Sequence, residues 1–206
     1  MPYNWYQREE ESKRFGGLDK WFAAHNNYQI KDSMAEIVQS AKKADFTQLK
    51  DVRLSEEDIK NIEKAIDYCN KYVIKFAAAS PQTNFYLFFP PYSRMLFARW
   101  YQSDKKSAII HQNVVRYFAE MSEVYPNIHV YGFEDQTFPD DIALYKDTGH
   151  YHPCINTKIN EAIASGTHII TADNVDEYLQ KAELMALEFD LKGLAKRIED
   201  YLNSNQ

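Results

Sequence analysis

The pattern of hydrophobic and polar positions predicts a long helix that begins near Ser55. Acidic residues occupy positions 56–58, in the first turn, where the helix dipole favours them and where Ser55 can act as the N-cap. Apolar residues then recur at the 3-4-3-4-3 spacing of a single helix face, at Ile59, Ile62, Ile66, Cys69, Val73 and Phe76. We expect Ser80-Pro81 to end this helix and Cys69 to belong to the core.

Two short apolar runs predict the strands of a sheet. Residues 85–89 (FYLFF) are apolar at every position, which indicates a strand covered by helices on both faces. Residues 128–133 (IHVYGF) predict a second strand. Helical patterns at about 92–102 and 105–124 lie between the two strands. The spacing is typical of strands joined by helical crossovers.

The same alternation continues to the C-terminus. A helix is predicted to end at Ser165 with Gly166 after it, followed by a short strand at 168–170. Asn174 and Glu177 predict a capping-box start of the last long helical segment. Strands that alternate with long helices predict an α/β fold with a mostly parallel sheet over 51–206, preceded by an irregular or helical arm at 1–50 in a single overall domain.

Composition and charge exclude several classes of partner. The chain has 206 residues, 45% of them hydrophobic, which is enough for one buried core. Its net charge of -6 argues against nucleic acid, because phosphate binding needs a basic face. No run approaches the length of a spanning helix, and the first four residues lack the features of a signal peptide. We therefore expect no membrane contact by this chain itself.

The most informative chemistry lies in the segment 145–153 (YKDTGHYHP). Asp147 and His150 stand three residues apart in a turn that opens onto a helix. A carboxylate that orients an imidazole, which in turn takes a proton from a nucleophile, is the minimal base assembly for acyl transfer. We assign Asp147 and His150 as the candidate catalytic residues.

The surroundings of the proposed base come from loops that follow strands, because ligands of open α/β sheets bind beyond the carboxyl ends of the strands. The loops 90–94 and 134–141 both leave such ends. Ser93 lacks the Gly-flanked turn of a nucleophile elbow, so it is interpreted as a substrate-binding or helix-capping hydroxyl. Arg94 and Arg99 either hold an anionic group or are solvated. The candidate substrate-binding residues are Tyr92, Ser93, Arg94, Tyr151 and His152.

Two alternatives for the turn remain open. Asp147, His150, His152 and Cys154 are all metal-ligand types, but Pro153 favours a turn over the extended chain that would align the last three. The other alternative is that His150 merely caps and packs the turn. We expect no metal and no cofactor. The two cysteines do not form a disulfide framework, and Cys154 is interpreted as a small residue in the first turn of a helix.

The Asp-x-x-His turn resembles the last block of the SGNH/GDSL hydrolase superfamily, in which such a turn supplies the acid and the base of a Ser-His-Asp triad. The run 145–156 (YKDTGHYHPCIN) with the following Gly166, the segment HIITADN and the upstream FYLFFPPYSRML resemble bacterial envelope members related to the alginate O-acetyltransferases and the teichoic-acid D-alanine transfer protein. The resemblance covers roughly 84–181. It implies a flavodoxin-like three-layer fold.

The expected nucleophile block is not found. Ser12 and Ser33 lie in strongly polar contexts with no strand before them, and nothing before residue 84 resembles a Gly-Asp-Ser turn. We expect the chain to be the C-terminal portion of an acyl esterase or acyltransferase that acts on envelope carbohydrate. Such a parent implies an extracytoplasmic location if it is membrane-anchored, and otherwise a cytoplasmic one. The competing hypothesis is a non-catalytic carbohydrate-binding or envelope assembly module.

The resemblance also implies that this chain lacks the first strand of the sheet. The loss of that strand leaves an apolar sheet edge that must be covered. The aromatic arm at 5–22 is the only unassigned apolar material. We therefore expect this arm to fold over the sheet, or two chains to pair as a homodimer, and deletion of residues 1–22 to cause aggregation or loss of cooperative melting.

Overall fold

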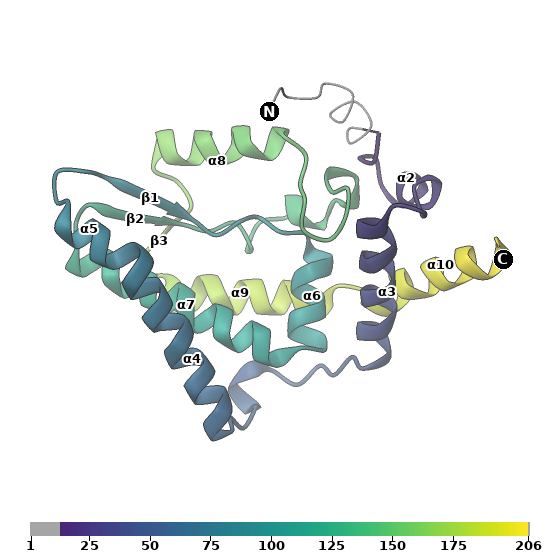
Figure 1. Ribbon diagram of the computed structural model, residues 1–206, viewed down its shortest axis with the longest axis horizontal. Coiled ribbons are helices and arrows are strands. Elements are labelled where there is room, and N and C mark those ends of the chain that lie inside the picture. The colour runs from purple at the N-terminus through teal and green to yellow at the C-terminus, as the bar shows by residue number, and fades with distance from the viewer. Residues whose placement is uncertain (1–12, 206) are drawn as a thin grey trace.

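The computed structural model describes residues 13–205, which form helices around a small sheet (Figure 1). The strands are β1 (Phe85–Phe88), β2 (Ile128–Tyr131) and β3 (Ile169–Ile170). The α-helices are α2 (Leu18–Ala23), α3 (Tyr28–Lys42), α4 (Glu56–Cys69), α5 (Lys75–Ala79), α6 (Arg94–Gln102), α7 (Lys105–Val124), α8 (Cys154–Ser165), α9 (Val175–Glu188) and α10 (Leu191–Ser204). Shorter helical turns are η1 (Leu49–Asp51), η2 (Asn70–Ile74), η3 (Phe138–Asp140) and η4 (Ile142–Leu144).

The sheet is mixed, with the strand order β1-β2-β3. β1 pairs with β2 in parallel, and Phe85 aligns with Ile128. β3 pairs with β2 in the antiparallel direction. Between α8 and β3 the backbone adopts left-handed conformations at Gly166 (φ 67°) and His168 (φ 59°). The α/β class is confirmed, whereas the expected mostly parallel sheet is only partly present.

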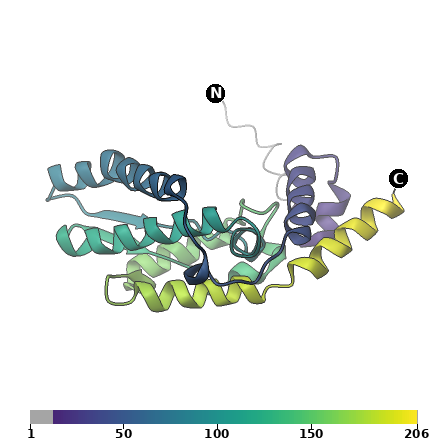
Figure 2. The ribbon, with the colours of Figure 1, turned by 90° about the horizontal axis from the view of Figure 1, so that it is seen from below.

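Helices cover the two faces of the sheet unequally. α7 and α9 lie on one face, and α8 lies on the other (Figures 1 and 2). Val130 and Ile170 are buried against Val115 and Leu179 on the first face. On the second face, Tyr131 belongs to a core that includes Ile155 of α8 and helices α3 and α10.

β1 departs from the prediction of a strand buried on both faces. The side chains of Phe85 and Leu87 pack into the core, but Tyr86 is 48% exposed and Phe88 is 42% exposed. The sequence FYLFF did not reveal this difference. Successive side chains of a strand point to opposite faces, but all five residues are apolar, so the residue types do not show which face is exposed.

The predicted helix from Ser55 is present, but its apolar face does not stay in register. Ser55 and Asp58 form a capping box at its start. The π-helical turn η2 follows α4, and its wider turn rotates the residues after it. Ile74 and Ala77 are therefore buried, whereas Phe76 is exposed. Cys69 is half-buried and packs against the core from its periphery, so the prediction of a core position is confirmed only in part.

The capping box predicted at Asn174 is not formed. Asn174 is the N-cap residue of α9, but its side chain makes no capping hydrogen bond to the helix. Its Oδ1 accepts from the Thr171 N–H, and its Nδ2 donates to the Ile169 carbonyl. The side chain instead stabilises the turn that follows β3.

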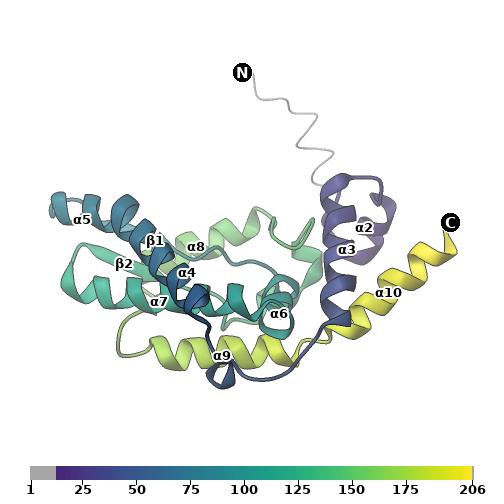
Figure 3. The same cartoon turned by 60° about the horizontal axis from the view of Figure 1, so that its bottom comes forward.

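The described part of the N-terminal arm packs away from β1 (Figure 3). Trp21 is fully buried and donates through Nε1 to the Tyr145 carbonyl at 3.0 Å. The Phe22 ring stacks on Tyr201 of α10. This placement contradicts the expectation that the arm covers the sheet edge, as far as residues 13–22 are concerned. Residues 1–12, which the expectation also included, lie outside the described residues. None of the described helices is long and apolar enough to cross a membrane.

Candidate functional site

The Asp147 turn is the tip of a small hairpin. Tyr145 and Tyr151 form an antiparallel bridge, and the Lys146 N–H donates to the His150 carbonyl at 3.1 Å. The Tyr145 hydroxyl donates to the Pro91 carbonyl at 2.8 Å, which fastens the hairpin to the segment after β1. Burial raises the pKa of Tyr145, so its hydroxyl stays a neutral donor. The tip is therefore fixed relative to the sheet.

The Asp147 carboxylate organises this tip. Its Oδ1 accepts from the backbone N–H groups of Gly149 at 2.9 Å and His150 at 2.7 Å. A short acidic side chain that bonds the backbone two and three residues ahead is typical of such turns. The Asp147 side chain is only 5% exposed, so these bonds replace the water that a buried carboxylate would otherwise need.

The same carboxylate holds the imidazole of His150. His150 Nδ1 lies 2.7 Å from Asp147 Oδ2 and 2.9 Å from Oδ1. An ionised carboxylate only accepts, so Nδ1 carries the proton and donates. The His150 side chain is 61% exposed, and its Nε2 has no hydrogen-bond partner among the described residues. This tautomer presents the Nε2 lone pair to the surface, where it can accept a proton.

Ser93 lies buried beneath the Asp147 turn and is hydrogen-bonded to it. It is fully buried, and its Oγ donates to the Thr148 carbonyl at 2.6 Å. The same Oγ accepts from the Leu96 N–H and caps α6. The capping interpretation is thus confirmed, and burial leaves Ser93 out of reach of a substrate. Tyr92 is half-buried beside the turn, since a Cβ on Gly149 would lie 3.8 Å from its ring.

Arg94 is buried too, which contradicts both a solvated and a substrate-binding role. Its Nε donates to Asp140 Oδ1, its Nη1 to the Glu134 carbonyl and its Nη2 to the Gln136 carbonyl, each at 2.6 Å. The guanidinium therefore fixes the loop after β2 against the first turn of α6. Arg99 pairs instead with Glu36 of α3 at 2.7 Å.

Tyr151 and His152 follow the turn and are half-buried. The His152 ring contacts Phe15 edge-on at 4.9 Å between centroids, and its Nδ1 accepts from the Cys154 N–H. Cys154 is exposed at the start of α8. Within residues 13–205, no group of three or more His, Cys, Asp or Glu side chains is placed to hold a metal ion.

A second carboxylate–imidazole pair was not predicted from the sequence. His111 Nε2 of α7 lies 2.6 Å from Glu134 Oε1, and Glu134 is 1% exposed. Phe89, Phe97 and Trp100 surround the imidazole. The only available signal was the position of Glu134 in a loop after a strand. This buried pair ties α7 to that loop.

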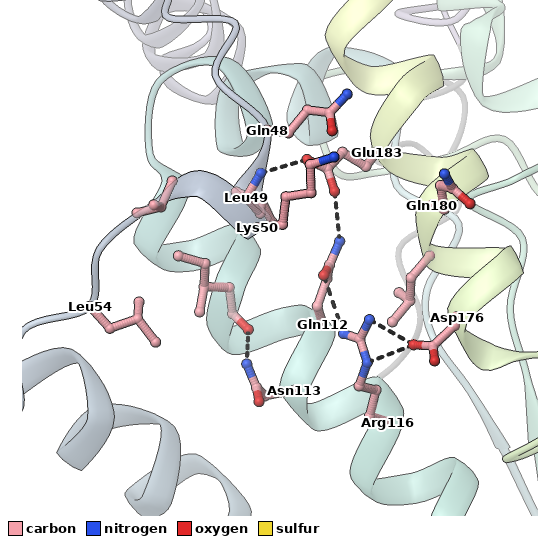
Figure 4. A pocket seen from close by; sticks show the side chains of 13 residues that line it. Gln48, Leu49, Lys50, Leu54, Gln112, Asn113, Arg116, Asp176, Gln180 and Glu183 are labelled. Carbon is pink, nitrogen blue, oxygen red and sulfur yellow. Dashed lines mark hydrogen bonds and ion pairs between the residues drawn. The ribbon is translucent and has the colours of Figure 1, made fainter.

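A cavity of about 540 Å³ lies between η1, α7 and α9 (Figure 4). Several of its polar side chains are already hydrogen-bonded or ion-paired within its lining. Glu183 accepts from the Leu49 N–H at 2.7 Å, and Arg116 pairs with Asp176 at 2.9 Å. None of its lining residues comes from the Asp147 turn, so this cavity is separate from the candidate base.

The chain matches no protein-family model, no curated protein and no solved structure. The geometry of the turn is therefore the basis for any functional assignment.

Replacing Arg94 tests whether it holds the strand-end loops together. Arg94→Met leaves two buried carbonyls and Asp140 without their donor, so we expect a loss of about 3–5 kcal/mol in the free energy of unfolding. The measurement is urea denaturation followed by circular dichroism. Arg197→Met, at an exposed position of α10, is the matched control and should change stability by less than about 0.5 kcal/mol. Equal effects of the two substitutions would contradict the assignment.

Replacing Asp147 tests the orientation of the imidazole. In the wild type, neutral His150 should carry its proton on Nδ1, because a hydrogen bond to a charged acceptor contributes about 1.5–3 kcal/mol. In Asp147→Asn, the amide can donate to Nδ1, and the proton should move to Nε2. Nitrogen-15 NMR of the imidazole measures this tautomer directly. The exposed His168 is the internal control, and an unchanged His150 tautomer would show that Asp147 does not set it.

Proposed function

We propose that this chain supplies the acid and the base of an SGNH-type acyl esterase or acyltransferase that acts on an envelope carbohydrate. His150 is the general base and Asp147 is its orienting carboxylate. The observation that carries the proposal is the 2.7 Å contact between His150 Nδ1 and the buried Asp147 Oδ2. The nucleophilic serine is supplied by a segment outside this chain.

The distribution of burial supports a base over a packing role for His150. A histidine that serves only to cap or pack a turn has no need to expose its second nitrogen. Here the carboxylate is buried and saturated with donors, while the imidazole it holds stays mostly exposed. A rigid acid behind an accessible imidazole is the arrangement that removes a proton from an approaching hydroxyl.

The described residues offer no nucleophile to this base. No hydroxyl or thiol among residues 13–205 is hydrogen-bonded to His150 Nε2. Ser93, which follows β1, donates its hydroxyl hydrogen bond to the Thr148 carbonyl. Half-buried Tyr92 and Tyr151 flank the turn and offer faces on which a sugar ring can pack. These features agree with a base that works on a serine and an ester brought from elsewhere.

The chain alone should hydrolyse small esters poorly. Without a nucleophile, only weak catalysis from the exposed imidazole remains, so turnover of p-nitrophenyl acetate should lie close to that of free histidine. Ser93→Ala should leave this rate unchanged. Robust turnover that disappears in Ser93→Ala would identify Ser93 as the nucleophile and refute the proposal.

The polypeptide encoded by the whole reading frame provides the positive test. If the reading frame supplies an upstream serine in a Gly-Asp-Ser turn, that polypeptide should release acetate from acetylated polysaccharide. His150→Ala should then lower kcat by at least about a thousandfold. His168→Asn, at an exposed position with positive φ, is the control and should keep full activity. Binding of the polysaccharide without hydrolysis would favour the binding module instead.

A further inference from the structure

The free edge of β1 points to a partner that the fold of the described residues does not supply. β1 is the first strand of the sheet, and it pairs only with β2 among the described residues. Apart from the shortness of its four residues, β1 lacks the features that usually protect an edge, since FYLF has no charge and no proline and pairs with β2 in unbroken register. Such an edge is a template for another strand.

The unpaired backbone groups belong to Tyr86 and Phe88. The Phe85 N–H donates to the Asn127 carbonyl and the Phe89 N–H to the Tyr131 carbonyl, so the odd-numbered residues face β2. Because main-chain groups alternate along a strand, those of Tyr86 and Phe88 point to the free edge. The same two residues carry the exposed aromatic rings of this strand. The outward backbone groups and the exposed aromatic rings of β1 thus belong to the same two residues.

We propose that β1 pairs with β1 of a second copy of this chain in the antiparallel direction. With Leu87 on the two-fold axis, Tyr86 stands opposite Phe88 of the other copy, and Phe88 stands opposite its Tyr86. Each opposed pair exchanges two backbone hydrogen bonds, so all four outward groups on each of the two strands are satisfied. The pairing joins two three-stranded sheets into one of six strands.

The side chains fit the same register. Opposed residues of an antiparallel pair project to the same face, so each Tyr86 ring meets a Phe88 ring of the other copy. Tyr86 already stacks on His129 at 5.0 Å, which holds its ring on that face. Helices α4 and α5, with the turn η2 between them, lie on the same side of the molecule as β1 (Figure 2). This continuous helical segment exposes Tyr68, Tyr72 and Phe76. A second copy of the chain would cover apolar surface that is otherwise left to water.

The antiparallel arrangement leaves both candidate sites open. The carboxyl ends of the two β1 strands point in opposite directions along the joined sheet. Each His150 therefore lies at its own end of the assembly, away from the new pairing. The pairing does not require His150 to act as a base, but it excludes an additional strand at the same edge of β1.

Sedimentation velocity over about 1–100 µM tests the pairing, because this range covers dissociation constants in the micromolar region. The wild type should sediment as a dimer at the upper end. Tyr86→Lys/Phe88→Lys places like charges opposite each other at both pairs and should raise the Kd by about a hundredfold. Tyr86→Lys/Phe88→Glu places opposite charges at both pairs in this register and should restore the dimer, with affinity that falls in high salt.

The control variant is Tyr28→Lys/Phe46→Lys, which changes two exposed aromatic residues outside the sheet and should leave the dimer intact. Circular dichroism melting checks that each variant folds. Hydrogen exchange adds a readout without substitution, since the Tyr86 and Phe88 amides should become protected as concentration rises. A wild-type monomer at 100 µM with these two amides in fast exchange would overturn the proposal. So would a lysine–glutamate variant that behaves like the lysine–lysine one.

Discussion

The position of the candidate base depends on the hydrogen bonds made by the first turn of α6. Ser93 binds the Thr148 carbonyl within the Asp147 turn, and Arg94 binds two carbonyls of the loop after β2. Neighbouring residues of one helix thus anchor two segments that are far apart in the sequence. Because Arg94 is 1% exposed, water cannot replace it, and the loops that it joins must move together.

The chemistry at the turn follows from that rigidity. A carboxylate can orient an imidazole only if its own oxygens are fixed, and Asp147 is fixed by two backbone N–H groups and by burial. The hydrogen bond from His150 Nδ1 to this carboxylate then limits rotation of the imidazole. The site therefore has a defined direction, from the buried acid to the exposed Nε2, before any substrate arrives.

Local features could be predicted from the sequence, and distant partners could not. The cap at Ser55, the cap at Ser93 and the contact between Asp147 and His150 each join residues that are three apart in the sequence. Arg94 looked like any helical arginine, because its partners lie about 40 to 46 residues away in the sequence. His111 and Glu134 were missed for the same reason.

Errors about the sheet arose from residue type and from chain direction. FYLFF reads as fully buried, yet the burial of Tyr86 depends on whether an element lies over it, which the pattern of one strand does not encode. The antiparallel direction of β3 has no signal in the sequence of the strand itself, and of the two left-handed residues before β3 only Gly166 is of the type that favours this conformation. The flavodoxin-like arrangement remains an expectation from the resemblance, while the mixed three-stranded sheet is what the described residues form.

The central claim is that the Asp147–His150 pair activates a serine, and covalent labelling tests it most directly. A fluorophosphonate probe reacts with a serine only when an adjacent base activates it. Applied to the polypeptide of the whole reading frame, it should modify one serine, located by peptide mass spectrometry, and labelling should vanish in His150→Ala. Labelling that persists in His150→Ala, or a whole polypeptide with no serine that the probe modifies, would contradict the account.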